Sequence, residues 1–115
     1  MIDESRFNCP FELTIELIGG KWKGLILWHL LDKKVLRNGE MLRLIPKITK
    51  KMLTQQLREM EENGLVSRVI YEQVPPKVEY SLTPHGEALR PILDMMIDWG
   101  VEYARDNNIT IACGS

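Results

Sequence analysis

The sequence predicts an α+β fold that is mainly helical, with one β-hairpin placed between helices. Two observations favour this class. Most of the chain carries apolar residues at the spacing of amphipathic helices, whereas two neighbouring segments, LVSRVIYEQV and KVEYSLT, are rich in Val, Ile and Tyr. The 115 residues show no internal repeat, low-complexity tract or flexible linker, so we expect a single domain spanning residues 1–115.

Two helices are expected in the first third of the chain. The first should start at Pro10, which suits the first position of a helix, and should end at the Gly-Gly pair at 19–20. The second should run from about residue 21 to residue 31, with an apolar cluster supplying its buried face. A turn then leads to a short extended piece at 35–36.

Two further helices follow each other closely. The segment NGEMLRLI predicts a short helix that Pro46 ends. A longer helix is expected at about 49–63, with Thr49 as its N-cap and Asn63-Gly64 as its stop. Because only a few residues separate them, the two helices should form a helix-turn-helix unit.

After this unit the residue pattern changes from that of helices to that of strands. The two strand-like segments lie on either side of Pro75-Pro76, where no backbone N–H is needed for hydrogen bonds between strands, and they predict a hairpin at about 65–83. Thr83 and Pro84 should begin a last helix that reaches about residue 106 and is kinked or restarted at Pro91. This order of elements is that of a winged helix-turn-helix with one helix added at each end.

The net charge of −1 hides an uneven distribution. Residues 21–58 hold ten Lys or Arg against two acids, and the remainder holds five basic residues against fourteen acids. No acid lies between Arg43 and Arg58. Such asymmetry is expected when one face meets a polyanion such as DNA, whereas a merely solvated charged face, the alternative, would mix signs.

The helix at 49–63 carries its charges against its own dipole. Lysines stand at its N-terminus and glutamates at its C-terminus, and each such placement costs up to about 1 kcal/mol at an exposed position. One arc of the helix contains only cations, amides and hydroxyls, the groups that reach phosphates and base edges. We therefore expect DNA phosphates beside the lysines to offset the unfavourable interaction of these lysines with the helix dipole. That arc is formed by Lys50, Lys51, Thr54, Gln55 and Arg58, opposite Leu53, Leu57 and Met60.

Residues outside the arc extend the predicted DNA-binding site. Arg68 near the start of the hairpin and Lys77 in its turn could touch the flanking backbone or minor groove; the alternatives are a strand-edge charge and a solvated turn lysine. The complete predicted set is Arg43, Lys47, Thr49, Lys50, Lys51, Thr54, Gln55, Arg58, Arg68 and Lys77.

The last helix predicts a homodimer. It carries more apolar surface than a domain of this size would bury along one stripe, and two-fold pairing is the commonest remedy. The alternative is that these residues close the core of a monomer. They are Met95, Met96, Ile97, Trp99, Val101 and Tyr103.

Three motifs carry a resemblance to a known family. KMLTQQLREMEENGLV, VPPKVEYSLT and GGKWK resemble the HxlR-type winged-helix transcription regulators, relatives of the MarR group, and the similarity spans residues 9–103. The resemblance implies a dimeric bacterial repressor or activator that binds a pseudo-palindromic operator, with the recognition helix at 49–63, the wing at 65–83 and dimerisation helices at both ends. Two positions depart from the family pattern: Asn38 replaces an aromatic residue, which puts local packing in doubt, and Lys47 replaces a glycine, which adds a cation.

Cys9 is the residue that suggests a redox response. Cys9 precedes the first helix, where backbone N–H groups favour thiolate, although Asp3 and Glu4 oppose that effect and an inert cysteine is the alternative. The resemblance adds that some relatives are redox or quinone sensors with a cysteine at this place. Cys113 of a partner chain is a candidate for a disulfide with Cys9. The effector, if any, would be an oxidant, an electrophile or a small aromatic molecule.

Other classes of function find little support. His29 and His85 share no spacing with a nucleophile or metal ligands, and GGKWKG is neither a phosphate loop nor a dinucleotide motif, so we expect no enzyme, cofactor or metal. The longest apolar run is too short for a membrane span, and we expect a cytoplasmic protein. The rival hypothesis is a winged-helix assembly module whose basic face meets an acidic protein partner.

Overall fold

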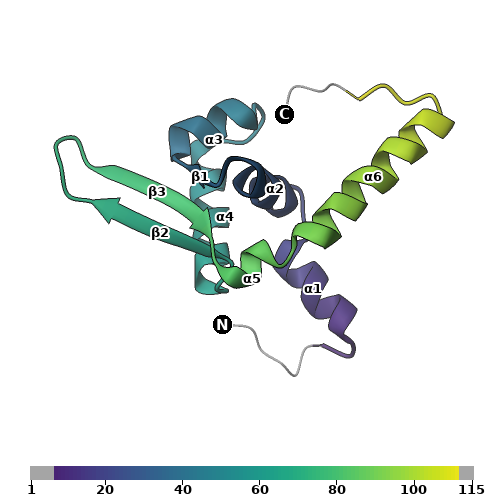
Figure 1. The fold of residues 1–115 in the computed structure, drawn as a ribbon, viewed down its shortest axis with the longest axis horizontal. Coiled ribbons are helices and arrows are strands. Elements are labelled where there is room, and N and C mark those ends of the chain that lie inside the picture. Colours follow the sequence, from purple (N-terminus) through teal and green to yellow (C-terminus); the bar gives the residue numbers. More distant parts are fainter. Residues whose placement is uncertain (1–6, 112–115) are drawn as a thin grey trace.

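A computed structural model describes residues 7–111 of the chain. In Figure 1 a helical body carries the hairpin on one side and the last long helix on the other. The elements in chain order are α1 (Pro10–Ile18), α2 (Lys23–Lys33), β1 (Val35–Leu36), α3 (Asn38–Leu44), α4 (Lys50–Glu62), β2 (Val66–Tyr71), β3 (Lys77–Leu82), α5 (Pro84–Glu87) and α6 (Arg90–Asp106).

The strands form one small antiparallel sheet in the order β1-β3-β2. Val35 lies opposite Ser81, and Arg68 lies opposite Tyr80. A helix-turn-helix of α3 and α4 followed by this hairpin is a winged helix-turn-helix, with α1 and the α5–α6 pair added at the two ends. The predicted fold class is confirmed.

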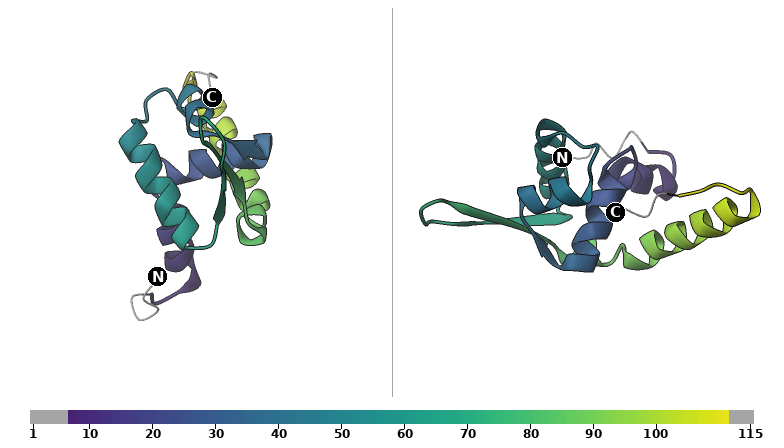
Figure 2. Two further views of the ribbon diagram at one scale, coloured as in Figure 1. Left: turned by 90° about the vertical axis from the view of Figure 1, so that its left-hand side faces the viewer. Right: turned by 90° about the horizontal axis from the view of Figure 1, so that it is seen from above.

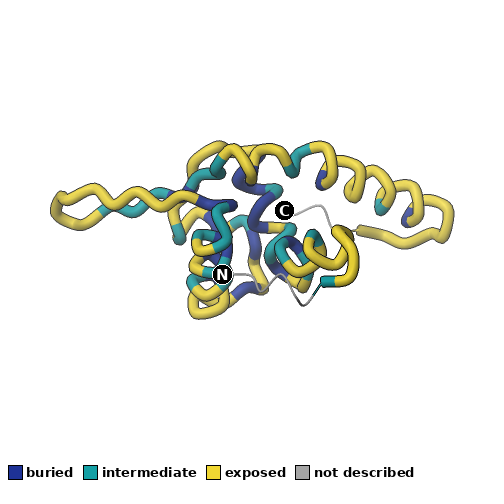
Figure 3. Tube along the Cα trace, turned by 90° about the horizontal axis from the view of Figure 1, so that it is seen from below, coloured by how far each residue is buried: buried dark blue, intermediate teal, exposed yellow. Residues whose placement is uncertain are grey.

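The core is built around α2. The largest side chains that are almost fully buried come from α2, α3, α4 and the start of β2, and Figure 3 shows the buried residues concentrated in the body while most of the hairpin and α6 is exposed. Each such apolar side chain contributes about 1.5–3 kcal/mol on burial. They are Ile26, Leu27, Leu30, Met41, Leu53, Leu57, Met60 and Val66.

Element boundaries differ from the prediction mainly at α2 and near the last helix. α2 begins at Lys23 rather than residue 21, because Gly20 adopts a φ of 86° and the chain is still turning there. The last helical segment is divided: α5 ends at Glu87, and α6 starts at Arg90 with Pro91 in its first turn. The predicted restart at this proline is confirmed.

Thr83 joins three elements at one point. Its hydroxyl donates to the Gly64 carbonyl oxygen at 2.5 Å and accepts from the Gly86 N–H at 3.2 Å. Its own N–H donates to the Leu65 carbonyl oxygen at 3.0 Å. The end of α4, the start of β2 and the first turn of α5 are therefore held together, and the N-cap predicted at Thr83 is confirmed.

We expect Gly86→Ala to destabilise the protein by roughly 2–3 kcal/mol, since overpacking a tight site has that cost. A Cβ at Gly86 would overlap the Leu65 carbonyl oxygen and crowd the Leu82 side chain. Urea unfolding followed by circular dichroism measures the change. Gly39→Ala is the matched control, because its nearest neighbour would be the end of the Arg43 side chain at 3.9 Å. Equal midpoints for both variants would contradict the packing argument.

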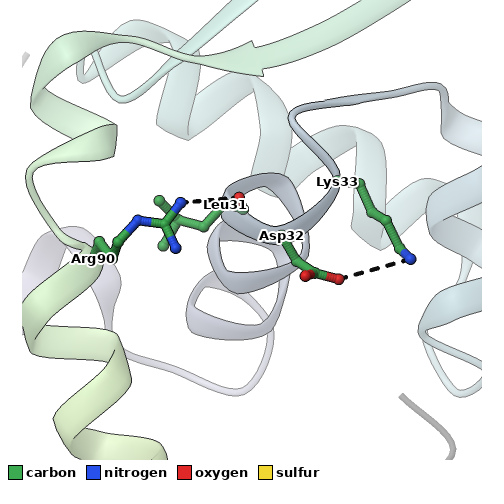
Figure 4. A network of polar contacts seen from close by, with 4 residues as sticks. All are labelled: Leu31, Asp32, Lys33 and Arg90. Carbon is green, nitrogen blue, oxygen red and sulfur yellow. Dashed lines mark hydrogen bonds and ion pairs between the residues drawn. The ribbon is translucent and has the colours of Figure 1, made fainter.

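α6 is attached to the body near its first turn. The Arg90 guanidinium donates to the Leu31 carbonyl oxygen at 3.1 Å, and Figure 4 shows this contact beside the Asp32–Lys33 ion pair at the end of α2. Beyond it, Leu93 and Ala104 are the buried residues of α6. Most of the apolar surface of α6 therefore faces solvent in the single chain.

His29 lies in the core of α2, 1% exposed, with Trp28 edge-on at 5.2 Å between ring centroids. Neither ring nitrogen has a hydrogen-bond partner among the described residues. Burial lowers the pKa of His29 from its ordinary value; Asp32 acts in the opposite direction and Lys33 in the same direction. His29 is therefore held neutral in the folded protein at neutral pH.

We expect His29 to make the protein less stable in acid. The pKa of His29 is lower in the folded protein than in the unfolded chain, where it is about 6.5. As the pH falls through that value, the unfolded chain therefore binds more protons than the folded protein does. The free energy of unfolding then decreases. Urea unfolding at about pH 5 and about pH 7.5 measures this. His29→Leu removes the titrating group and should weaken the dependence. An unchanged acid response in His29→Leu would refute the assignment.

Candidate nucleic-acid interface

α4 is fixed in rotation by its buried face. The Thr49 hydroxyl accepts the Met52 N–H at 3.1 Å and caps the helix, as predicted. Leu53, Leu57 and Met60 are at most 1% exposed. Because these positions lie along one stripe, the opposite face of α4 must point outward.

The predicted arc is brought together on that outward face. Lys50, Lys51, Gln55 and Arg58 are exposed, Thr54 is half-buried, and all five line one open surface. Figure 2, left, shows α4 lying along one edge of the molecule. Within residues 7–111, the three cations of this face form no ion pair. Their charges are therefore available to an external anion.

The acids of α4 are not all directed away from this surface, which corrects the prediction of a carboxylate-free side. Glu61 turns toward the hairpin, but Glu59 and Glu62 line the same surface as Arg58. The reason is the helical period: residues 55, 59 and 62 are four and then three positions apart and so share one stripe. The purely cationic and amide surface ends at about Arg58.

Each of the two hairpin cations already lies close to a glutamate. Arg68 on β2 is exposed, and its Nε lies 3.5 Å from Oε1 of Glu61. Lys77 is half-buried, with its Nζ 3.4 Å from Oε2 of Glu79 and 4.9 Å from the centre of the Tyr71 ring. Placing Lys77 in the turn was wrong: residues 72–76 form the connection, and Lys77 is the first residue of β3, opposite Tyr71.

The remaining predicted residues border α4. Lys47 is exposed in the connection between α3 and α4, and Thr49 is exposed at the cap. Arg43 is exposed on α3, where it lines a separate surface hollow together with Arg37, Glu40 and Glu79. The structure therefore gathers one compact group on α4 and leaves Arg43 and the hairpin cations around it.

Comparison with known proteins decides the family. Residues 17–108 match the HxlR-like helix-turn-helix family. The chain belongs to this family. YkvN of Bacillus subtilis strain 168, an HTH-type transcriptional regulator, is 58% identical over 99 residues, which cover 86% of this chain and 83% of YkvN. YdeP of the same organism, also an HTH-type transcriptional regulator, is 56% identical over 96 residues, 84% of this chain and 74% of YdeP.

A solved structure supports the same conclusion. The redox regulator HypR in its reduced form superposes with a TM-score of 0.79 at 52% sequence identity, covering 85% of this chain and 95% of HypR. This HxlR-like protein is therefore a transcriptional regulator of the helix-turn-helix type and not an enzyme, as the sequence predicts. Helix-turn-helix regulators bind DNA.

Two departures from the HxlR pattern can now be placed. Asn38 is half-buried in the first turn of α3, and its Oδ1 is buried without a hydrogen-bond partner among the described residues. A buried unsatisfied oxygen costs about 1–3 kcal/mol, so the doubt about packing at this position has a physical basis. Lys47 is exposed and is free to meet a phosphate.

Cys9 is exposed and is the N-cap residue of α1. Its backbone N–H donates to the Glu12 carboxylate at 3.1 Å. Cys113, Asp3 and Glu4 lie outside the described residues. Across the part of the chain that the structure describes, no group of three or more His, Cys, Asp or Glu could hold a metal, and no helix is long and apolar enough to cross a membrane.

One pair in this HxlR-like regulator was not predicted from the sequence. Nζ of Lys23, the first residue of α2, lies 2.9 Å from Oε2 of Glu59 on α4. The two residues lie in different helices and share no local spacing, so no sequence period indicates the contact.

Proposed function

We propose that this protein is a dimeric bacterial regulator that binds a pseudo-palindromic operator with α4 in the major groove. The observation that carries the proposal is the outward face of α4, where Lys50, Lys51, Gln55 and Arg58 are exposed and the cations are unpaired among the described residues. A surface of this composition matches what major-groove readers present to DNA.

The chemistry assigns different roles along α4. Lys50 and Lys51 at its N-terminus would contact phosphates, which offset the unfavourable interaction of these lysines with the helix dipole. Gln55 would read adenine through N6 and N7, and Arg58 would read guanine through O6 and N7. Thr54 would contact a phosphate or a thymine methyl group.

The flanking residues would hold the duplex in register. Arg43, Lys47 and Thr49 are exposed near the start of α4 and would contact adjacent phosphates. Arg68 and Lys77 would serve as wing contacts, and each would first have to leave its glutamate partner. We therefore expect the wing to contribute less than α4.

The exposed apolar residues of the end helices support the dimer. Met95 is 71% exposed, Trp99 66% and Met96 56%, and on α1 Phe11 is 70% exposed. Large apolar side chains this exposed are typical of an interface, and two-fold pairing is the usual solution. A symmetric dimer would place two copies of α4 about 34 Å apart, one turn of the duplex.

The proposal also includes redox control through Cys9. The thiol is exposed at the start of α1, and α1 belongs to the proposed dimer surface, so oxidation or electrophile attack there would act on subunit arrangement. That HypR is a redox regulator with both oxidized and reduced forms supports the idea by similarity. Disulfide formation with Cys113 of a partner is one product to test.

Selection of bound duplexes from a random pool, with and without diamide, tests the proposal. The expected result is a repeated half-site with spacing of about one helical turn, affinity that falls steeply with salt, and enrichment that changes with diamide. A Cys9→Ser variant should lose the diamide effect while keeping the half-site. If no duplex is enriched even at low salt, the DNA-binding proposal fails and the alternative, an assembly module for an acidic protein partner, is favoured.

A further inference from the structure

The ion pair between α2 and α4 has unusual geometry for a surface contact. Lys23 Nζ and Glu59 Oε2 are 2.9 Å apart, while the other ion pairs of the described residues span 3.4 to 4.0 Å. The Lys23 side chain is only 14% exposed, whereas that of Glu59 is 42% exposed. The ammonium group thus belongs to a largely covered side chain, while the Glu59 side chain stays partly accessible to solvent.

The position of Glu59 makes its charge matter for DNA. Glu59 follows Gln55 by one helical turn and lines the surface formed by Lys51, Gln55 and Arg58. An unneutralised carboxylate there would repel the phosphates that the lysines attract, and at physiological ionic strength the repulsion would be felt over about 8 Å.

Lys23 itself is poorly placed to contact DNA. It is largely covered, and it stands in the first turn of α2, where the helix dipole disfavours a cation and no acid of that turn compensates. An opposite charge in contact offsets this cost and holds the lysine in place.

We propose that Lys23 is a positioning residue for the DNA-binding surface: through its ion pair it neutralises Glu59 and holds that carboxylate away from the phosphates. The inference rests on the proposed function of α4. It gives the first lysine of α2 a role in operator affinity although this lysine touches no phosphate.

The full-length protein and its selected operator test this with three variants. Lys23→Met should lower operator affinity about tenfold at low salt, because Glu59 is left charged and unpaired. Glu59→Gln should bind at least as tightly as the wild type, and the double variant Lys23→Met/Glu59→Gln should return to within about twofold of it. Lys33→Met is the matched control: it removes a lysine of the same helix, paired with Asp32 at 3.7 Å, and should change affinity less than twofold.

Removal of the Glu59 charge separates this role from direct contact. Glu59→Gln should restore operator affinity to Lys23→Met, whereas Lys51→Met, which loses a phosphate contact, should stay weak when it is combined with Glu59→Gln. Unchanged affinity in Lys23→Met, or a double variant as weak as the single one, would each overturn the inference.

Thermal unfolding of every variant controls for misfolding. If Lys23→Met does not fold, Glu59→Gln decides, since weaker binding than the wild type would contradict the neutralising role and equal or tighter binding would support it. Failure of the wild type to bind duplex DNA would instead refute the proposed function, and with it the basis of this inference.

Discussion

Lys51→Glu combined with Arg58→Glu is expected to lower operator affinity by about 10² to 10³-fold while the fold is retained. A good bidentate contact contributes about 1–3 kcal/mol of discrimination, and each reversal also adds a charge that repels phosphate. Both side chains are exposed and form no ion pair among the described residues, so reversing them breaks no internal ion pair. Fluorescence anisotropy with labelled operator measures the affinity, and circular dichroism checks the fold.

A second charge reversal separates a specific site from a general effect of net charge. Lys33→Glu with Lys34→Glu changes the net charge by the same amount at exposed positions where α2 ends. We expect this pair to weaken binding by less than about tenfold, through long-range electrostatics alone. If both double variants lose affinity equally, α4 would not be the recognition element.

Trp99→Glu is expected to convert the proposed dimer into a monomer and to weaken operator binding by about 10²-fold or more. Trp99 is 66% exposed in the single chain and stacks on Tyr103 with ring centroids 5.1 Å apart, so it presents a large apolar surface to a partner. A carboxylate at this place would have to be desolvated on pairing, which is costly. Loss of the second half-site removes an avidity gain of about 10² to 10⁴-fold.

Analytical ultracentrifugation measures the mass, and anisotropy with a full operator and a single half-site measures binding. Val74→Glu is the control for added charge, because Val74 is 99% exposed in the connection between β2 and β3. In Figure 1 this connection and α6 lie on opposite sides of the helical body. This variant should leave the mass unchanged. A dimeric wild type together with a Trp99→Glu protein of the same mass would show that the subunits pair through another surface.

Local physics explains what the sequence determined by itself. The spacing of Leu53, Leu57 and Met60 fixes which face of α4 is buried, and a helix has only one opposite face, so the arc of Lys50 to Arg58 could be placed without a structure. Thr49, Thr83 and Pro91 act on the residues next to them, which is why the caps and the restart before α6 were predictable.

Contacts between distant segments were decided only by the tertiary structure. Nothing near Lys23 in the chain indicates Glu59, and the partners of Arg68 and the two-way hydrogen bond of Thr83 arise only when α4 and the hairpin pack together. The place of Glu59 on the outward surface follows from the helical period, since it lies one turn after Gln55, but its pairing with Lys23 does not. The neighbours of a residue along the chain determine its backbone conformation, but which charged side chains it contacts depends on how the helices pack.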